Sequence, residues 1–424
     1  MAILLLSLLF GFLIMGLPIF LNLMATGLIT LVSFFPMDPL ILIQRGIGGV
    51  NKFSLLAIPF FLLAAQIVSE GEIGERLIKL AKTLVGHLPG GLALTTVVTC
   101  MIFGAISGAG AAAVVAIGSI VYPALTKSDY GEKFSMGLIL SSSSIAMLVP
   151  PGIAMVLYAI LTGNSIANLF IAGLGVGILL GLGFMIYSYI YAKKHDIVLE
   201  ERATLKEVWD ALKEGVWALG LPVIIIGGIY SGVFTPTEAA GVSVAYAAFV
   251  EMVIYKDISV KELFEISCKA GNTIAMIMIL IAAGSIISWV MTIGQLPQMV
   301  VSLLSGANNI VILLLLNVVF LIAGMFIDPN SAIIVLTPLV YPLTRVLGID
   351  PIHFGMIIVL NLSIGMITPP FGLNIFVATG AFDIGYERIV SGILPFIIIN
   401  LIILMLITFV PQISLFLPRL LLGG

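Results

Sequence analysis

The chain has few charged residues. Of its 424 residues, 18 are Lys or Arg and 21 are Asp or Glu, so 9% carry a formal charge, against about 25% in a typical soluble domain. Five runs contain no Asp, Glu, Lys or Arg, and each is longer than the roughly 20 residues that cross a bilayer as a helix. These runs cover 1–37, 83–126, 134–192, 270–327 and 389–418. They are continuously apolar, which indicates an all-α polytopic membrane protein and excludes a β-barrel.

Other absences exclude further classes of protein. A net charge of −3 leaves no basic surface for nucleic acid. The two cysteines, Cys100 and Cys268, are too few for a disulfide framework, and His87, His195 and His353 are too scattered to indicate a metal cluster. The sequence has no GxxxxGK[ST] motif, so it is not expected to be an ATPase of the P-loop type.

Proline, glycine and the few charges divide the apolar sequence into four predicted parts. N-terminal scaffold helices cover 1–53, with a loop at 36–53. A first repeat covers 54–192, connecting scaffold helices cover 193–271, and a second repeat covers 272–417. Each repeat is expected to hold a scaffold span, an amphipathic arm helix in the membrane interface, an interrupted hairpin and a broken span.

The positions of Lys and Arg predict the orientation. Cationic residues gather in 193–213 and in 256–269, and two spans separate these loops, so both lie on the cytoplasmic side. The cationic residues on either side of 90–125 also lie on the cytoplasmic side only if this segment enters and leaves the membrane by the same face. It is therefore expected to be a re-entrant hairpin. A span at 272–292 then crosses outward, a second hairpin at 310–344 enters from outside, and both termini end outside.

A shift of 219 residues aligns the two repeats. Four matches fall in this register: Tyr122-Pro123 with Tyr341-Pro342, Ser144 with Ser363, Met147 with Met366, and Pro150-Pro151 with Pro369-Pro370. The hairpins are expected to enter from opposite faces, so the repeat is inverted, as in many secondary transporters. Chance similarity between low-complexity membrane segments is the alternative.

Four interruptions carry the expected chemistry. They are the hairpin tips at 104–110 and 324–330 and the broken spans at 141–152 and 361–372. Each Pro-Pro pair removes two backbone N–H donors, and the freed carbonyls, with Ser and Thr hydroxyls, can form an oxygen cage for Na⁺. Half-helix N-termini at the same place favour an anion. This predicts two Na⁺ sites with a substrate site between them, whereas the alternative is that these residues only kink the helices.

Three further residues have more than one possible role. Asp328 is the only Asp, Glu, Lys, Arg or His between Ala270 and Arg345, and it can ligate a cation, cap the following half-helix or bind substrate. Glu238 follows Thr235-Pro236-Thr237, a pattern that predicts a helix cap. Ser107 has no base at a comparable depth, which argues against a serine nucleophile and a membrane enzyme.

Along nearly its whole length the sequence resembles one known family, the large membrane subunit (DctM-type) of tripartite ATP-independent periplasmic (TRAP) transporters. The motifs that carry the resemblance are AIPFF at 57–61, GHL at 86–88, GGLA at 90–93, FGAISG at 103–108, AIGS at 116–119, PP at 150–151, FTPTEAA at 234–240, GIDPIHFG at 348–355 and GMITPPFG at 365–372. Together and in this order they are highly specific, although each alone is not.

The resemblance implies Na⁺-driven import of a small organic anion, a carboxylate or sulfonate, across a bacterial or archaeal cytoplasmic membrane. It implies an elevator mechanism, with at least two Na⁺ as coupling ions. It also implies a small four-helix membrane subunit (DctQ-type) and a periplasmic substrate-binding protein (DctP-type) as partners. A stand-alone Na⁺/dicarboxylate symporter of similar architecture is the alternative.

The resemblance also assigns site residues. The first Na⁺ site would comprise Ser107, Gly108, Ser144, Ala146 and Val149, and the second Gly324, Asp328, Gly365, Thr368 and Phe371. Candidates for substrate binding at the same tips and breaks are Ser107, Ala109, Ser143, Asp328, Asn330, Asn361 and Asn374. Some family members meet the substrate carboxylate with an arginine near the second hairpin, but 270–327 contains none here. The resemblance therefore does not assign a particular substrate to this chain.

Overall fold

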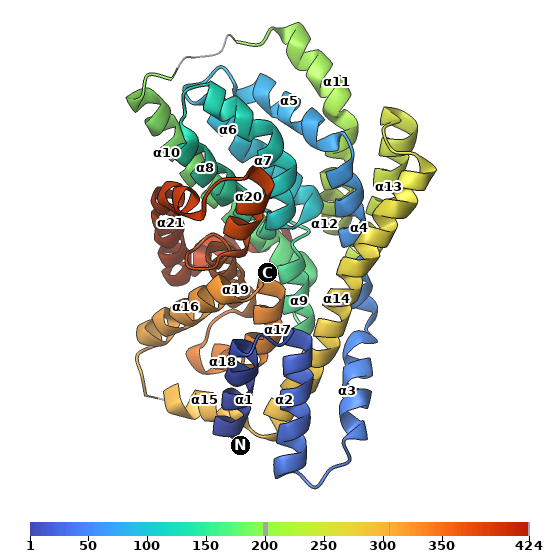
Figure 1. Ribbon diagram of the computed structural model, residues 1–424, viewed down its shortest axis with the longest axis vertical. Helices are drawn as coiled ribbons and strands as arrows, with labels where there is room; N and C mark the ends of the chain where they lie inside the picture. Colours follow the sequence, from blue (N-terminus) through green and yellow to red (C-terminus); the bar gives the residue numbers. More distant parts are fainter. Residues whose placement is uncertain (198–201, 305, 423–424) are drawn as a thin grey trace.

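The structure is a computed structural model that describes residues 1–197, 202–304 and 306–422. Within these ranges the chain is built from helices, and no strand is found (Figure 1). Eight helical segments of this part of the chain are long and apolar enough to cross a membrane. The charged stretch around 193–213 includes residues 198–201, which lie outside the described residues.

The helices of the first half, in chain order, are α1 (Ala2–Ile14), α2 (Ile19–Phe34), α3 (Leu40–Val50), η1 (Phe53–Leu56), α4 (Ala57–Glu70), α5 (Ile73–Val85), α6 (Gly91–Ser107), α7 (Gly110–Lys127), α8 (Glu132–Ser144), η2 (Ile145–Met147), α9 (Ile153–Thr162) and α10 (Ile166–Lys194). Those of the second half are α11 (Leu205–Pro222), η3 (Val223–Gly227), α12 (Gly228–Tyr230), α13 (Pro236–Phe249), η4 (Val250–Tyr255), α14 (Val260–Ile293), α15 (Leu296–Leu304), α16 (Asn309–Phe326), α17 (Pro329–Val340), α18 (Leu343–Leu347), α19 (Pro351–Gly365), α20 (Leu373–Phe382), α21 (Tyr386–Phe409) and α22 (Pro411–Leu422).

The helix bounds repeat with the period found in the sequence. Adding 219 to the bounds of α6 gives 310–326, and α16 covers 309–326. Adding 219 to those of α8 gives 351–363, and α19 covers 351–365. Figure 1 places α5, α6 and α7 in the upper half of the molecule and α15, α16 and α17 in the lower half. The predicted all-α fold with two opposed hairpins and two broken helices is thus confirmed.

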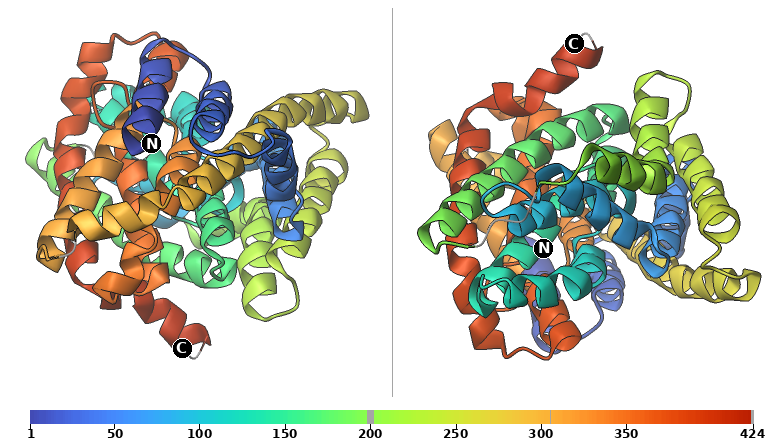
Figure 2. Two further views of the ribbon diagram at one scale, coloured as in Figure 1. Left: turned by 90° about the horizontal axis from the view of Figure 1, so that it is seen from below. Right: turned by 90° about the horizontal axis from the view of Figure 1, so that it is seen from above.

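Two groups of helices lie on opposite sides of the molecule. On one side α14 packs against α2, α3 and α4, and α4 also packs against α13. On the other side α8, α10, α16, α19 and α21 form a second group through the α8–α21, α16–α19 and α10–α19 contacts. Both views of Figure 2 show the yellow α14 and the red C-terminal helices on opposite sides. The division of the chain at 53, 192 and 271 stays a prediction.

The prediction of a loop at 36–53 was wrong, because this segment contains the helix α3. The Asp38 Oδ1, from just before this helix, accepts from the Leu40 N–H at 2.8 Å. Gly49 lets the helix lie close to α14, since a methyl group there would come 2.0 Å from the Ser285 Oγ. The neighbouring helix therefore stabilises a segment whose glycines and charges suggested a loop.

Two predicted spans also have different limits. The span expected at 272–292 begins much earlier, because Ser259 and Glu262 form a capping box at the start of α14. The charge-free run at 389–418, expected to cross the membrane as a helix, is interrupted at Val410 between α21 and α22, where Pro411 has no N–H to continue the helical hydrogen bonds. The predicted cap at Thr235 and Glu238 is confirmed as a capping box at the start of α13.

Candidate functional site

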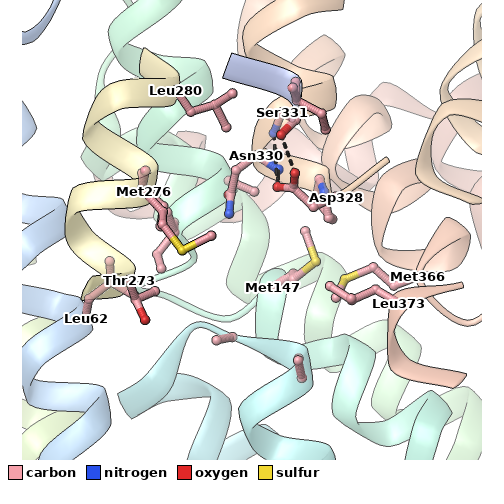
Figure 3. Close-up of a pocket in the computed structure, with 18 of the residues that line it drawn as sticks. Leu62, Met147, Thr273, Met276, Leu280, Asp328, Asn330, Ser331, Met366 and Leu373 are labelled. Atoms are coloured by element: carbon pink, nitrogen blue, oxygen red, sulfur yellow. Dashed lines mark hydrogen bonds between the residues drawn. The ribbon is translucent and has the colours of Figure 1, made fainter. Parts of the chain in front are cut away.

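A cavity of about 630 Å³ lies where the two hairpin tips face helices α2, α4 and α14 (Figure 3). The tips contribute Gly108, Ala109, Gly110, Ala111, Asp328, Pro329, Asn330 and Ser331, the broken spans contribute Met147, Ile153, Ala154, Met366 and Leu373, and the opposing side contributes Pro18, Ile19, Phe20, Leu62, Thr273, Met276, Ile277, Ile279 and Leu280. Among these lining residues Asp328 has the only ionisable side chain. The cavity is therefore mostly apolar, with its polar groups concentrated at the second tip.

At the second tip, side chains of the tip itself cap the start of α17. Asp328 is the N-cap of α17, and its Oδ1 accepts from the backbone N–H groups of Asn330 at 3.0 Å and Ser331 at 3.1 Å. The Ser331 hydroxyl donates to the other carboxylate oxygen. The predicted capping role of Asp328 is thus confirmed, and Asn330 extends into the cavity (Figure 3).

The first tip has no such cap. Helix α6 ends at Ser107, and Gly108 adopts a left-handed conformation with φ of 60°, which favours glycine. Ala109 is the N-cap of α7 and offers no side-chain hydrogen bond. The first N–H groups of α7, from Gly110 onward, therefore have no side-chain acceptor and lie at the edge of the cavity.

Each tip packs against the broken span of its own repeat. A methyl group at Gly104 would lie 2.7 Å from the Ala146 Cα, and one at Gly108 would lie 2.3 Å from the Pro151 carbonyl oxygen. Pro150 has no N–H to donate to the carbonyl of Ala146, four residues earlier. At the first predicted Na⁺ site the Pro151 carbonyl oxygen thus faces the tip, and the Ser107 hydroxyl lies on the adjoining end of α6.

The second tip and break meet in the same way. A methyl group at Gly365 would lie 2.5 Å from the Gly324 Cα, and the Gly372 N–H donates to the Met325 carbonyl at 3.1 Å. The Thr368 hydroxyl donates to the Ile364 carbonyl at 2.6 Å, which leaves its lone pairs for a cation.

Phe371 is the remaining residue of the second predicted Na⁺ site. Phe371 is half-exposed and packs against Phe326, with ring centroids 5.1 Å apart.

One hydrogen bond joins the two breaks directly. The Ser363 hydroxyl donates to the Ser144 carbonyl at 2.8 Å, and these two residues are separated by the repeat period of 219. The Ser144 hydroxyl donates to the Ser141 carbonyl at 2.7 Å. Among the described residues no group of three His, Cys, Asp or Glu is placed to hold a metal. The oxygens that these two breaks present belong to carbonyls and hydroxyls.

The predicted substrate-binding residues fall into two sets. Ala109, Asp328 and Asn330 line the cavity, whereas Ser107, Ser143, Asn361 and Asn374 are buried outside its lining. The Asn361 amide donates to the Asn317 Oδ1 at 2.7 Å, and the Asn317 amide donates to the Thr408 hydroxyl at 3.0 Å. This chain of bonds ties α19 to α16 and α21, so a structural role of Asn361 is shown and a substrate role stays a prediction.

Asn374 has a different environment. It is fully buried, and neither atom of its amide group has a hydrogen-bond partner. A methyl group at Gly110 would lie 3.3 Å from its Nδ2, so the Asn374 side chain of the second repeat stands beside the start of α7 in the first. Its place next to the uncapped helix end keeps it a candidate for positioning a ligand.

Sequence reasoning missed several lining residues. Met147 and Met366 face the cavity from the two breaks, whereas in the sequence they stand out only as a match in the repeat. Their shared register was a signal that could have identified them. Thr273 and Met276 on α14, and Leu62 on α4, carried no signal because only the packing of the helices brings them to the tips.

Comparisons with known proteins agree with this architecture. Residues 6–413 match the family described as "Tripartite ATP-independent periplasmic transporter, DctM component". The ectoine TRAP transporter large permease protein TeaC of Halomonas elongata is 39% identical over 413 residues, which are 96% of each chain. The C4-dicarboxylate TRAP transporter large permease protein DctM of Pseudomonas aeruginosa is 39% identical over 396 residues, 93% of each chain.

A solved structure shows the same fold. The YdaH transporter of Alcanivorax borkumensis superposes with a TM-score of 0.61 at 15% identity, covering 87% of this chain and 86% of that one. That structure shows the fold, whereas the match to the family over almost the whole chain and the two relatives show the family. The chain belongs to the DctM family, the large membrane component of tripartite ATP-independent periplasmic transporters, and is a transport protein and not an enzyme.

Proposed function

We propose that this multi-pass inner-membrane protein imports a small carboxylate-bearing solute in symport with Na⁺. The observation that carries the proposal is the uncapped start of α7 at the edge of the central cavity. A helix N-terminus carries a partial positive charge and free N–H donors, so it suits the carboxylate of a substrate. Within the described lining it is the strongest feature that attracts an anion, because no cationic side chain is present.

Sodium coupling follows from the same shortage of positive charge. Asp328 adds a negative charge to the cavity that must hold an organic acid. Na⁺ ions at the two tip–break contacts would offset the charge of the substrate and would use the carbonyl and hydroxyl oxygens gathered there. We assign the first ion to the contact of Gly108 with the 144–149 segment and the second to that of Gly324 with the 365–371 segment.

An elevator mechanism fits the division of the cavity wall. Both tips and both breaks lie on one side of the cavity, and the Ser363–Ser144 hydrogen bond joins the two breaks. The opposing wall comes largely from α2, α4 and α14 and is almost entirely apolar. A polar unit that carries ions and substrate can slide along such an apolar wall without breaking hydrogen bonds across it.

The substrate and partners are inferred from relatives. Ectoine and C4-dicarboxylate are named for the two relatives above, and both are compact carboxylates that a cavity of about 630 Å³ accommodates. The family name implies a periplasmic binding protein and a small membrane subunit. Both termini are assigned to the periplasmic side.

Reconstitution in proteoliposomes tests the proposal. The chain, its small subunit and its binding protein are expected to accumulate labelled ectoine or succinate when an inward Na⁺ gradient is applied, and not with an equal K⁺ gradient. Uptake that needs no Na⁺ would refute the coupling. Equal uptake without the binding protein would instead favour the alternative, a stand-alone Na⁺/dicarboxylate symporter.

A further inference from the structure

A second cavity, of about 430 Å³, lies between α3, α14 and the end of α9. Its polar lining comprises Gln44, Arg45, Lys52, Ser285, Ser288 and Thr292, together with the indole of Trp289. It is therefore lined by two cations and several neutral hydrogen-bonding groups, whereas the central cavity has one carboxylate and no cation in its lining. This cavity lies on the side assigned above to the periplasm.

The packing of α3 on α14 creates this arrangement. Gly49 stands directly against Ser285, so the two helices approach closely. Arg45 and Lys52 are seven residues apart, and both border the cavity. The Arg45 guanidinium lies over the Trp289 ring, 5.1 Å from its centroid. In the described part of the chain neither cation forms an ion pair, so both charges are available to a ligand.

Helix α9 connects the two cavities. Its first residues, Ile153 and Ala154, line the central cavity, and Leu161 near its end lines the second one. Seven residues separate Ala154 from Leu161, a rise of about 11 Å along a helix. A solute held beside Trp289 is thus within a short distance of the tips.

We propose that the cavity of Arg45, Lys52 and Trp289 binds the carboxylate of an incoming substrate before it reaches the central cavity. The proposal rests on the proposed function, in that the transported solute is a carboxylate. Two cations concentrate anions electrostatically, and the hydroxyl and amide groups around them supply hydrogen bonds to carboxylate oxygens. The central cavity, which has no cation in its lining, receives the substrate only when Na⁺ is bound.

Trp289 provides a direct test in the full chain. The protein has three tryptophans, so the variant with Trp209→Phe and Trp217→Phe keeps Trp289 as the only reporter. In phosphatidylcholine nanodiscs we expect iodide to quench this fluorescence about threefold more efficiently than in the same protein with Arg45→Gln and Lys52→Gln. Quenching by neutral acrylamide should be equal in both, and succinate should remove the excess iodide quenching.

Matched changes elsewhere control for charge. Arg202→Gln with Lys206→Gln removes the same two charges near α11 and should leave iodide quenching of Trp289 unchanged. Equal iodide quenching with and without Arg45 and Lys52 would overturn the proposal, as would excess quenching that succinate fails to remove. Loss of the excess in nanodiscs containing phosphatidylglycerol would also overturn it, because a lipid phosphate would then be the occupant.

Uptake measurements separate this proposal from the proposed function. Arg45→Gln with Lys52→Gln is expected to raise the half-saturating concentration of substrate-loaded binding protein about threefold without lowering the maximal rate. If these variants also weaken binding of the unloaded binding protein to the nanodiscs, the cations contact that protein and the proposal fails. Fluorescence that responds as expected in a protein without Na⁺-driven uptake would refute the proposed function alone.

Discussion

The two hairpin tips occupy equivalent places in the repeat and have opposite chemistry. The second tip satisfies the start of its helix with the Asp328 carboxylate and the Ser331 hydroxyl. The first has only Ala109 at the equivalent place and leaves the start of α7 without a side-chain acceptor. Both tips otherwise pack through glycine against their own broken span.

This difference shows how a repeated fold can form an asymmetric site. Duplicated backbone places two helix N-termini at one cavity, and each attracts negative charge. At the second tip the protein supplies that charge itself, whereas at the first it leaves the position to a ligand. The substrate carboxylate is therefore expected at α7, and its other groups face Asp328 and Asn330.

The largest expected effect tests what the tips share. Gly365→Ala and Gly104→Ala should each abolish uptake, because the new methyl groups would lie 2.5 Å and 2.7 Å from backbone carbon atoms of the facing segment. Each should also lower the free energy of unfolding by about 1–3 kcal/mol. Gly380→Ala, with nothing within 4 Å, is the control. Normal uptake by either tip variant would show that the contacts are not close in the working protein.

The next effect tests what distinguishes the tips. Ala109→Asp should cap α7 as Asp328 caps α17, which would stabilise the protein by about 1 kcal/mol but occupy the place of the substrate carboxylate. We expect the half-saturating substrate concentration to rise at least about tenfold, equivalent to 1.4 kcal/mol. Ala109→Asn caps without charge and should be milder. If the Ala109→Asp variant binds substrate with unchanged affinity, the substrate carboxylate does not bind at the start of α7.

A smaller effect concerns the ions at the two breaks. Ser144→Ala and Thr368→Val should each raise the half-saturating Na⁺ concentration about fivefold, the loss of about 1 kcal/mol from one oxygen contact. Thr379→Val is a matched control, since the Thr379 hydroxyl donates to the Ile375 carbonyl in the same way at 2.9 Å. If the sodium dependence of uptake is the same in all three variants, the two cage assignments are wrong.

The smallest effect compares a cap at the cavity with one far from it. Glu238→Ala removes the capping box of α13 and should slightly reduce the free energy of unfolding, with no change in uptake per folded molecule. Asp328→Ala should cost similar stability and also impair uptake. Thermal unfolding and uptake measured on the same preparations distinguish the two. If Asp328→Ala reduces uptake per folded molecule no more than Glu238→Ala does, Asp328 acts only as a cap.

Much of the fold could be predicted because its signals are local or repeated. The charge-free runs, the Pro-Pro pairs and the 219-residue register located both hairpins and both breaks. Helix α3 was missed because its stability comes from packing on α14 through Gly49. The bond between Asn361 and Asn317 could not be predicted, since residues on one face of a helix contact whichever helices the fold brings to them.

The amino-acid sequence alone determined the membrane character, the repeat and the two residues at the tips, Ala109 and Asp328, because composition, register and capping are properties of short segments. Only the tertiary structure decided which side chains meet. It placed Met147, Met366 and Thr273 at one cavity and Arg45, Lys52 and Trp289 at another. Such contacts depend on how helices distant in the chain pack against one another, and no local pattern records that packing.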